Sequence, residues 1–218
     1  MKDLTRESHL TNDDPTAADR KRDHIQLAFD SQVIHSQLDQ RFYYEPLLAA
    51  HPQPEEWPPF RFLGKEMRVP LWVSSMTGGT QMARRINQNL GRACAEFGMG
   101  MGLGSCRPLL YDDDRLDDFN IRPIIGQGQL LFANLGIAQL EQVLARKEVW
   151  RIRAMIDKLA ADGLIIHVNP MQEWLQPEGD RFADPPLATI ERMLEALPDL
   201  PLIVKEVGQG MGPASLRA

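Results

Sequence analysis

The sequence predicts an α/β protein of the (β/α)8 class, a TIM barrel, of which about five β/α units are present. Apolar strand-like runs alternate with helical segments from residue 61 onward, which indicates a parallel sheet with crossover helices. Several of these runs end in polar or glycine-rich residues. A doubly wound sheet would collect its ligand contacts at one switch point. The spread of polar strand ends therefore favours a barrel with its site on the carboxyl face.

The first elements precede the barrel proper. Residues 1 to about 20 carry few apolar groups, a helix is expected after them, and the proline-rich stretch 51–60 predicts a loop. Segment 62–69 predicts a hairpin strand that caps the base of the barrel. Segment 69–75 predicts the first buried strand.

A helix is expected over residues 80–97. Thr80 is a suitable N-cap residue, and Gly98 is suited to end the helix. Apolar residues at helical spacing predict its buried face: Met82, Ile86, Leu90, Ala93 and Phe97.

Further strands are expected at 100–105, 130–136, 164–168 and 202–207, with helical segments at 137–161 and 186–197 and a last helix that opens at Pro213. Side chains alternate along 164–169, so Ile165, His167 and Asn169 share one face of the strand. Leu164, Ile166 and Val168 share the other face. A barrel of this kind takes about 250 residues, so this chain is expected to be the front part of a longer enzyme.

Composition narrows the class of protein. The 218 residues are 43% hydrophobic and carry a net charge of −6, which predicts a globular protein with a sizeable core and argues against general nucleic-acid binding. Cys94 and Cys106 are the only cysteines, which predicts a reducing cytoplasm. The polar start is unlike a signal peptide, and no apolar run approaches ~18 residues, so no membrane association is expected.

Candidate chemistry follows the strand ends. Gln172 offers a neutral amide and Glu173 a carboxylate suited to a divalent cation. Lys205 lies on an otherwise apolar strand, where an ammonium needs an anion or a cofactor as its partner. Simpler interpretations stay open beside these: the glycines after Thr77 serve only to turn into a helix, and His167 is a satisfied buried histidine.

Six motifs, in this order along the chain, carry a family resemblance. They are RKRDH (20–24), MTGG (76–79), GSCR (104–107), ANLG (133–136), HVNPMQE with QPEG (167–173 and 176–179) and VKEVG (204–208). Together they resemble the type 2 isopentenyl-diphosphate Δ-isomerases over residues 20–218.

The resemblance implies an FMN-dependent enzyme of isoprenoid biosynthesis. Such an enzyme interconverts isopentenyl diphosphate and dimethylallyl diphosphate, with reduced FMN as acid–base catalyst, Mg²⁺, and NADPH to reduce the flavin. Residues 1–60 would form an N-terminal extension and substrate-binding arm, and residues 61–218 a partial FMN-binding TIM barrel. The full-length protein is expected to be a homo-oligomer.

The resemblance also assigns roles to residues of this chain. Substrate contacts would come from Arg20, Lys21, Ser105, Arg107 and Gln172, of which Gln172 is also the catalytic candidate. Flavin contacts would come from Ser75, Met76, Thr77, Ser105, Asn134 and Lys205. Glu173 would bind the metal. The family commonly has Gln where this chain has Cys106, a change expected to make the site sensitive to oxidation.

Two alternatives stay open. An FMN-dependent oxidoreductase of the hydroxy-acid oxidase type would share the barrel and the flavin cradle. An inactive fragment of the isomerase would retain the motifs without turnover. Arg20 and Lys21, together with the pair Gln172 and Glu173, favour the isomerase over the oxidase.

Overall fold

A computed structural model of the chain describes residues 17–30, 47–48, 59–75 and 78–218. The chain divides into two units, Met1–Pro52 and Gln53–Ala218. Helix α1 (Ala17–Asp30) belongs to the first unit. The predicted boundary near residue 60 stays a prediction, because residues 49–58 lie outside the described ones.

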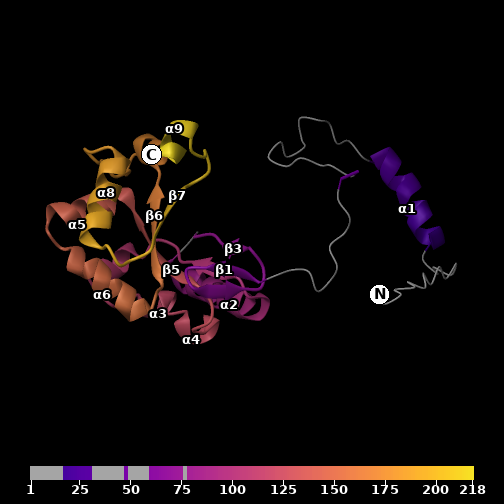
Figure 1. Cartoon of the computed structure of the whole chain (residues 1–218), viewed down its shortest axis with the longest axis horizontal. Helices are drawn as coiled ribbons and strands as arrows, with labels where there is room; N and C mark the ends of the chain where they lie inside the picture. The colour runs from indigo at the N-terminus through magenta and orange to yellow at the C-terminus, as the bar shows by residue number, and fades with distance from the viewer. Residues whose placement is uncertain (1–16, 31–46, 49–58, 76–77) are drawn as a thin grey trace, which may run out of the picture. The chain divides into compact units, whose positions relative to one another are not determined.

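The second unit is built on five parallel strands that follow one another in sequence order, β3-β4-β5-β6-β7. The sheet curls into half of a barrel, and α5, α6 and α8 cover one of its faces (Figure 1). This arrangement confirms the predicted fold class. The strands are β3 (Trp72–Val73), β4 (Gly100–Gly102), β5 (Leu131–Gly136), β6 (Gly163–Val168) and β7 (Leu202–Glu206).

A two-stranded hairpin precedes the sheet. Strands β1 (Phe60–Phe62) and β2 (Lys65–Met67) pair antiparallel. Their apolar side chains join the small core on the inner face of the sheet, a cluster of Met67, Leu130, Phe132 and Ile165 packed against Phe62, Trp72 and Ile203. The hairpin therefore closes the amino end of the half-barrel, as the sequence predicted.

Strand β6 divides its side chains between two environments. Leu164, Ile166 and Val168 pack in the larger core beneath the helices, whereas Ile165 joins the inner cluster. His167 shares the inner face and reaches the carboxyl end. The predicted alternation is confirmed, and it follows from the two-residue period of a strand.

Helix α2 (Gln81–Phe97) has the predicted ends but a different buried face. The hydroxyl of Thr80 accepts from the backbone N–H of Ala83, and Gly98 adopts the left-handed conformation with φ 70°. The predicted stripe is wrong at Met82, Ile86 and Phe97, which are exposed, whereas Leu90 packs partly buried against the larger core. The buried residues of the helix are Ala83, Asn87, Gly91 and Cys94.

The small residues explain this rotation of helix α2. A Cβ on Gly91 would lie 2.6 Å from the Ile121 side chain, so the helix lies closer to its neighbours than larger residues would allow. Close backbone approach outweighs the burial of larger apolar groups here.

The remaining helices complete the second unit. They are η2 (Arg107–Leu110, a 3₁₀ helix), α3 (Leu116–Phe119), α4 (Arg122–Ile125), α5 (Ile137–Ala145), α6 (Val149–Leu159), α7 (Pro170–Leu175), α8 (Pro186–Ala196) and α9 (Pro213–Arg217). The predicted helical segment 137–161 is two helices, because Lys147 takes a left-handed conformation with φ 59°. The short helices between β4 and β5 had no counterpart in the sequence prediction. None of the helices described is long and apolar enough to cross a bilayer.

A network of charges holds the amino ends of the strands together. The carboxylate of Asp162 contacts Lys65 Nζ at 2.6 Å and Arg122 Nη2 at 2.9 Å, and it accepts from the backbone N–H of Leu131 at 2.8 Å. The Arg122 guanidinium also donates to the backbone oxygens of Gly126, Gln129 and Ala160. This network joins the hairpin, α4, β5 and the start of β6 into one base.

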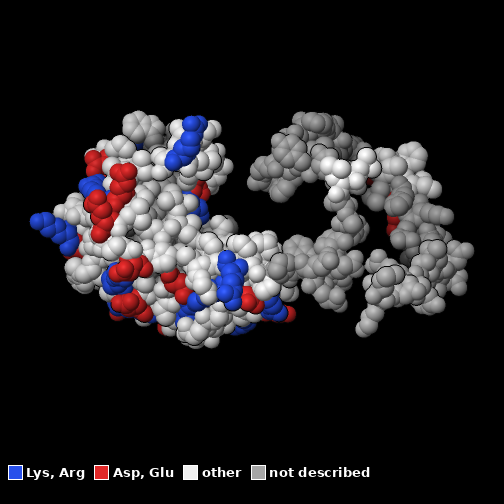
Figure 2. All heavy atoms as spheres, viewed as in Figure 1, with Lys and Arg blue, Asp and Glu red and all other residues white. Residues whose placement is uncertain are grey.

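Elsewhere on the second unit, acidic and basic side chains lie intermixed over the face visible in Figure 2. The expectation from net charge that the chain is not a general nucleic-acid binder stays a prediction.

Candidate active site

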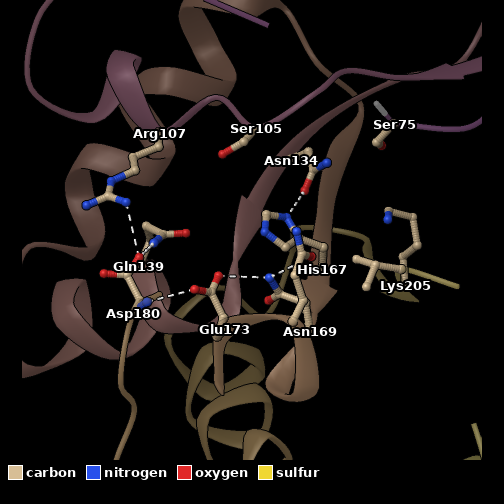
Figure 3. A pocket seen from close by; sticks show the side chains of 12 residues that line it. Ser75, Ser105, Arg107, Asn134, Gln139, His167, Asn169, Glu173, Asp180 and Lys205 are labelled. Atoms are coloured by element: carbon tan, nitrogen blue, oxygen red, sulfur yellow. Dashed lines mark hydrogen bonds and ion pairs between the residues drawn. The ribbon is translucent and has the colours of Figure 1, made fainter. Parts of the chain in front are cut away.

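A polar cavity of about 560 Å³ lies at the carboxyl ends of the strands (Figure 3). This is the face on which (β/α)8 proteins build their sites. Its lining residues are Ser75, Ser105, Arg107, Asn134, Gln139, His167, Asn169, Gln172, Glu173, Asp180, Lys205 and Val207.

The cavity collects most of the site residues predicted for the barrel, from several strand ends. These are Ser75, Ser105, Arg107, Asn134, Gln172, Glu173 and Lys205. Arg20 and Lys21 lie on α1 in the first unit, and their side chains are not among those described. Met76 and Thr77 lie outside the described residues. The functional roles of all these residues stay predictions.

Strand register places positions on neighbouring strands at the same height along the barrel. His167 on β6 pairs with Gly136 on β5 and with Lys205 on β7, so these positions lie at one height. Gly136 is required by space, because a Cβ there would lie 2.7 Å from His167 Nε2 and 2.3 Å from Gln139 Oε1. The sheet therefore brings an imidazole and an ammonium to the same end of the cavity.

The imidazole of His167 has a defined tautomer. Asn134 Nδ2 donates to the backbone oxygen of Leu103 at 3.1 Å, so Asn134 Oδ1 is left as the acceptor 2.8 Å from His167 Nδ1. His167 Nδ1 therefore carries the proton and Nε2 keeps its lone pair. Burial lowers the pKa of His167, nearby Lys205 lowers it further, and Glu173 opposes both. The ring is neutral at pH 7 and presents an acceptor.

The carboxylate of Glu173 is held at both oxygens. Asn169 Nδ2 donates to Oε1 at 2.8 Å, and the backbone N–H of Asp180 donates to Oε2 at 2.7 Å. Asn169 Nδ2 also reaches Gln172 Oε1 at 3.3 Å. Helix α7 thus presents a fixed carboxylate beside the Gln172 amide. No described residue accepts from its NH₂ group, which can donate toward a ligand.

Two polar groups in the cavity have few or no hydrogen-bond partners among the described residues. Ser75 Oγ is buried and has no hydrogen bond among the described residues. Lys205 Nζ is half-buried, and its one contact in the described part of the chain is the Glu206 backbone oxygen at 3.4 Å. Buried polar groups are normally satisfied, so a ligand is the natural partner for both.

Sequence reasoning missed two residues of the cavity. Asp180 Oδ2 lies 3.1 Å from Arg107 Nη1 and accepts from Gln139 Nε2 at 2.7 Å. Gln139 is buried in the first turn of α5. An amide at the start of an otherwise apolar helix that follows a strand is a sequence feature that could have predicted its place in the cavity. Asp180 lies in a loop without periodicity, so its position depends on how that loop folds.

The expected sensitivity of Cys106 to oxidation is wrong. The side chain is fully buried, and its Sγ donates to the Gly104 backbone oxygen at 3.4 Å. Burial raises its pKa to about 12, although a hydrogen bond with the Asn134 backbone opposes the shift. A thiol kept protonated and away from solvent is unreactive.

A parallel half-barrel with a charged cavity at its carboxyl ends defines a partial (β/α)8 barrel with a candidate binding site on its carboxyl face. Comparison with known proteins identifies the relatives. The chain is 38% identical over 199 residues to an isopentenyl-diphosphate delta-isomerase of Rickettsia rickettsii (strain Sheila Smith), covering 88% of this chain and 56% of that protein. It is 36% identical over 211 residues to the Synechocystis sp. protein of that name, covering 91% and 57%. For the Rickettsia africae protein of that name the identity is 43% over 150 residues, covering 69% and 42%.

The chain is therefore a homologue of the isopentenyl-diphosphate delta-isomerases, which confirms the family resemblance. It spans about half the length of the curated relatives it matches. No family model matches the chain.

Proposed function

We propose that this chain carries part of the active site of an enzyme that interconverts isopentenyl diphosphate and dimethylallyl diphosphate. The observation that carries the proposal is the homology to proteins named for this reaction, joined to a cavity whose charges suit a diphosphate. Arg107 and Lys205 supply positive charge, and Glu173 supplies a site for a divalent cation. The names of the relatives favour an isomerase over a hydroxy-acid oxidase.

Two features of the cavity support a flavin as its ligand. Among the described residues Ser75 Oγ has no hydrogen-bond partner and Lys205 Nζ has only the Glu206 backbone oxygen, and β4 contributes little side chain. A Cβ on Gly102 would lie 2.5 Å from Ser75 Oγ, so the glycine keeps the wall beside that hydroxyl open. Reduced FMN bound there, with NADPH as the source of electrons, would supply the acid–base chemistry of the reaction. Ser75, Ser105, Asn134 and Lys205 would hold it, together with Met76 and Thr77.

The cavity also fits Mg²⁺ shared with a substrate. Mg²⁺ usually takes one or two carboxylates and completes its shell with water and substrate phosphates. Glu173 is a carboxylate already oriented by two hydrogen bonds. The described residues contain no cluster of three His, Cys, Asp or Glu side chains that could hold a metal ion. We propose that the cation is shared with the substrate diphosphate, which supplies further oxygen ligands.

The chain's own residues then bind and orient the substrate. Ser105 and Arg107 would contact the diphosphate, joined by Arg20 and Lys21 from the arm. Gln172 is a weak acid and base, so its role would be to position a proton or the alkene with its free NH₂ group. A homo-oligomer in the cytosol completes the proposal, and two unpaired cysteines are suited to a reducing compartment.

The test is binding of isopentenyl diphosphate to the purified chain with FMN, measured by calorimetry with and without Mg²⁺. The parent chain should bind more tightly when Mg²⁺ is present. Glu173→Gln should lose that difference and keep its flavin, whereas Glu191→Gln on α8 should behave as the parent. An unchanged Mg²⁺ dependence in Glu173→Gln would remove Glu173 as the metal ligand.

A turnover assay separates the alternatives. Dimethylallyl diphosphate formed from isopentenyl diphosphate with FMN, NADPH and Mg²⁺ supports the isomerase. Flavin reduction by a 2-hydroxy acid would support the oxidase instead. Binding without turnover is what an inactive fragment of the isomerase predicts.

A further inference from the structure

Asp180 joins three elements around the cavity (Figure 3). Its carboxylate oxygen Oδ2 lies 3.1 Å from Nη1 of Arg107, in the segment after β4, and accepts from Nε2 of Gln139 on α5 at 2.7 Å. Its backbone N–H donates to Glu173 Oε2 on α7 at 2.7 Å. One residue therefore contacts both the cation and the carboxylate that face the cavity.

The loop that carries Asp180 is fixed to α7. A Cβ on Gly179 would lie 1.9 Å from the backbone oxygen of Glu173, so the chain approaches the helix as closely as a glycine allows. The next residue, Arg181, lies with its guanidinium 4.4 Å from the centre of the Trp174 ring. Contacts on both sides of Asp180 thus fix its position before any ligand binds.

Folding alone does not explain the pair between Asp180 and Arg107. The side chains are 25% and 55% exposed, and a pair with this exposure contributes little to stability. Gln139, in contrast, is buried, and its Nε2 donates a hydrogen bond to the Asp180 carboxylate. In the described part of the chain Arg107 has no other hydrogen-bond partner, so its remaining donors are free to meet an anion.

We propose that Asp180 is a positioning residue for diphosphate recognition. Its carboxylate holds one edge of the Arg107 guanidinium and leaves the other donors for the ligand, while its backbone N–H orients Glu173. The inference rests on the proposed function, which makes Arg107 a diphosphate ligand and Glu173 a magnesium ligand. Beyond that function, the inference assigns to Asp180 the positioning of both the Arg107 guanidinium and the Glu173 carboxylate.

A purely electrostatic role makes the opposite prediction. Asp180 carries a negative charge beside an anion site, so if charge alone mattered, its removal would strengthen anion binding. Positioning predicts weaker binding, because Arg107 would lose the orientation that it has before the ligand arrives. The sign of the change decides between them.

The first experiment measures binding of magnesium pyrophosphate to the full 218-residue chain by calorimetry. Asp180→Ala should weaken binding about tenfold, the lower range for loss of an orienting partner. Asp180→Asn should recover part of the loss, since its amide oxygen still accepts without carrying charge. Asp184→Ala is the matched control, because Asp184 forms an exposed pair with Arg192 outside the cavity. Unchanged or tighter binding in Asp180→Ala would overturn the proposal.

The second experiment needs no ligand. Nitrogen-15 relaxation of the Arg107 side chain reports the order of its guanidinium on the picosecond to nanosecond timescale. Asp180→Ala should lower that order, while the backbone amides of β6 and α7 keep theirs. An Arg107 side chain as ordered in the variant as in the parent would refute the positioning role.

The two measurements also separate this proposal from the proposed function. If the parent chain fails to bind magnesium pyrophosphate, the proposed diphosphate site is wrong, whereas the relaxation experiment still tests whether Asp180 orders Arg107. A double variant adds a third check. In an Arg107→Gln background, Asp180→Ala should cause no further loss of affinity, because the residue that it positions is gone.

Discussion

The two ends of the half-barrel differ in whether their polar and charged groups have partners within the protein. At the amino end, the Asp162 carboxylate and the Arg122 guanidinium find their partners within the protein. At the carboxyl end, Ser75 Oγ lacks such a partner among the described residues, and Lys205 Nζ has only the Glu206 backbone oxygen at 3.4 Å. The first arrangement stabilises the fold, and the second leaves polar groups for a ligand. The same strands therefore separate stability from binding along their length.

The electrostatics follow the same division. Burial raises the pKa of Asp162, but the hydrogen bonds from Lys65, the Leu131 backbone and Arg122 outweigh it, so the net pKa is lowered. The pKa of His167 is lowered too, there because burial and Lys205 disfavour its charged form. The amino end thus keeps its charge, and the carboxyl end keeps its imidazole neutral.

The largest expected effect comes from breaking the amino end. Asp162→Ala leaves Arg122, whose side chain is 5% exposed, without its carboxylate, and should lower the free energy of unfolding by about 3 kcal/mol. Urea denaturation checks this value, with Asp184→Ala as the exposed control. Flavin affinity of the folded fraction should not change. A loss no larger than that of the control would mean that the network contributes nothing to stability.

A substitution between the two ends should affect both properties. In Gly102→Ala the new Cβ would lie 2.5 Å from Ser75 Oγ and from Ile165 Cδ1, so overpacking should lower the free energy of unfolding by about 1–3 kcal/mol and weaken flavin binding. Gly128→Ala, where a Cβ meets nothing within 4 Å, is the control. Urea denaturation and flavin fluorescence report the two effects. If Gly102→Ala bound flavin as tightly as the parent, Gly102 would not line the cofactor site.

Lys205→Met should separate the two properties. Lys205 has no carboxylate partner among the described residues, so removing its ammonium should leave the free energy of unfolding unchanged or raise it by less than about 1 kcal/mol. Flavin binding should weaken about tenfold, the loss of one charge-assisted contact. Lys158→Met, which removes an exposed lysine paired with Asp113, is the control for the charge change. If Lys205→Met bound FMN as tightly as the parent, the lysine would be structural.

The smallest effect is a pH dependence from His167, the one histidine of residues 53–218. Its folded pKa lies below the ordinary value of 6.5, so the unfolded chain binds more protons as the pH falls. This contribution to stability is complete above pH 6.5 and is lost as the pH falls through the folded pKa. Unfolding free energies between pH 8 and 5 should decline more in the parent than in His167→Gln. Equal slopes would show that His167 titrates alike in both states.

The sequence predicted the parts of this molecule that local chemistry determines. The alternation in β6, the caps of α2 at Thr80 and Gly98, and the polar strand ends all follow from rules that act over a few residues. Seven of the twelve residues that line the cavity are therefore predictable from the sequence.

The errors arose where tertiary contacts decide. The buried face of α2 depends on how closely Gly91 approaches Ile121, which apolar spacing does not reveal. The break between α5 and α6 depends on the left-handed conformation of Lys147, a residue with no special preference for it. Asp180 reaches the cavity only because its loop folds back on α7, so neither spacing nor residue type pointed to it.

The alternation of side chains along β6 also determines how the site tolerates substitutions. Leu164 and Ile166 pack in the larger core beneath the helices, and His167 lines the cavity. A shift of one residue in the register of β6 would turn Leu164 and Ile166 toward the cavity and His167 into the core. The height of the imidazole is therefore specified by residues that never meet a ligand. Substitutions beneath the helices that loosen β6 should appear in an assay as altered affinity, and a screen for binding variants would recover positions far from the cavity.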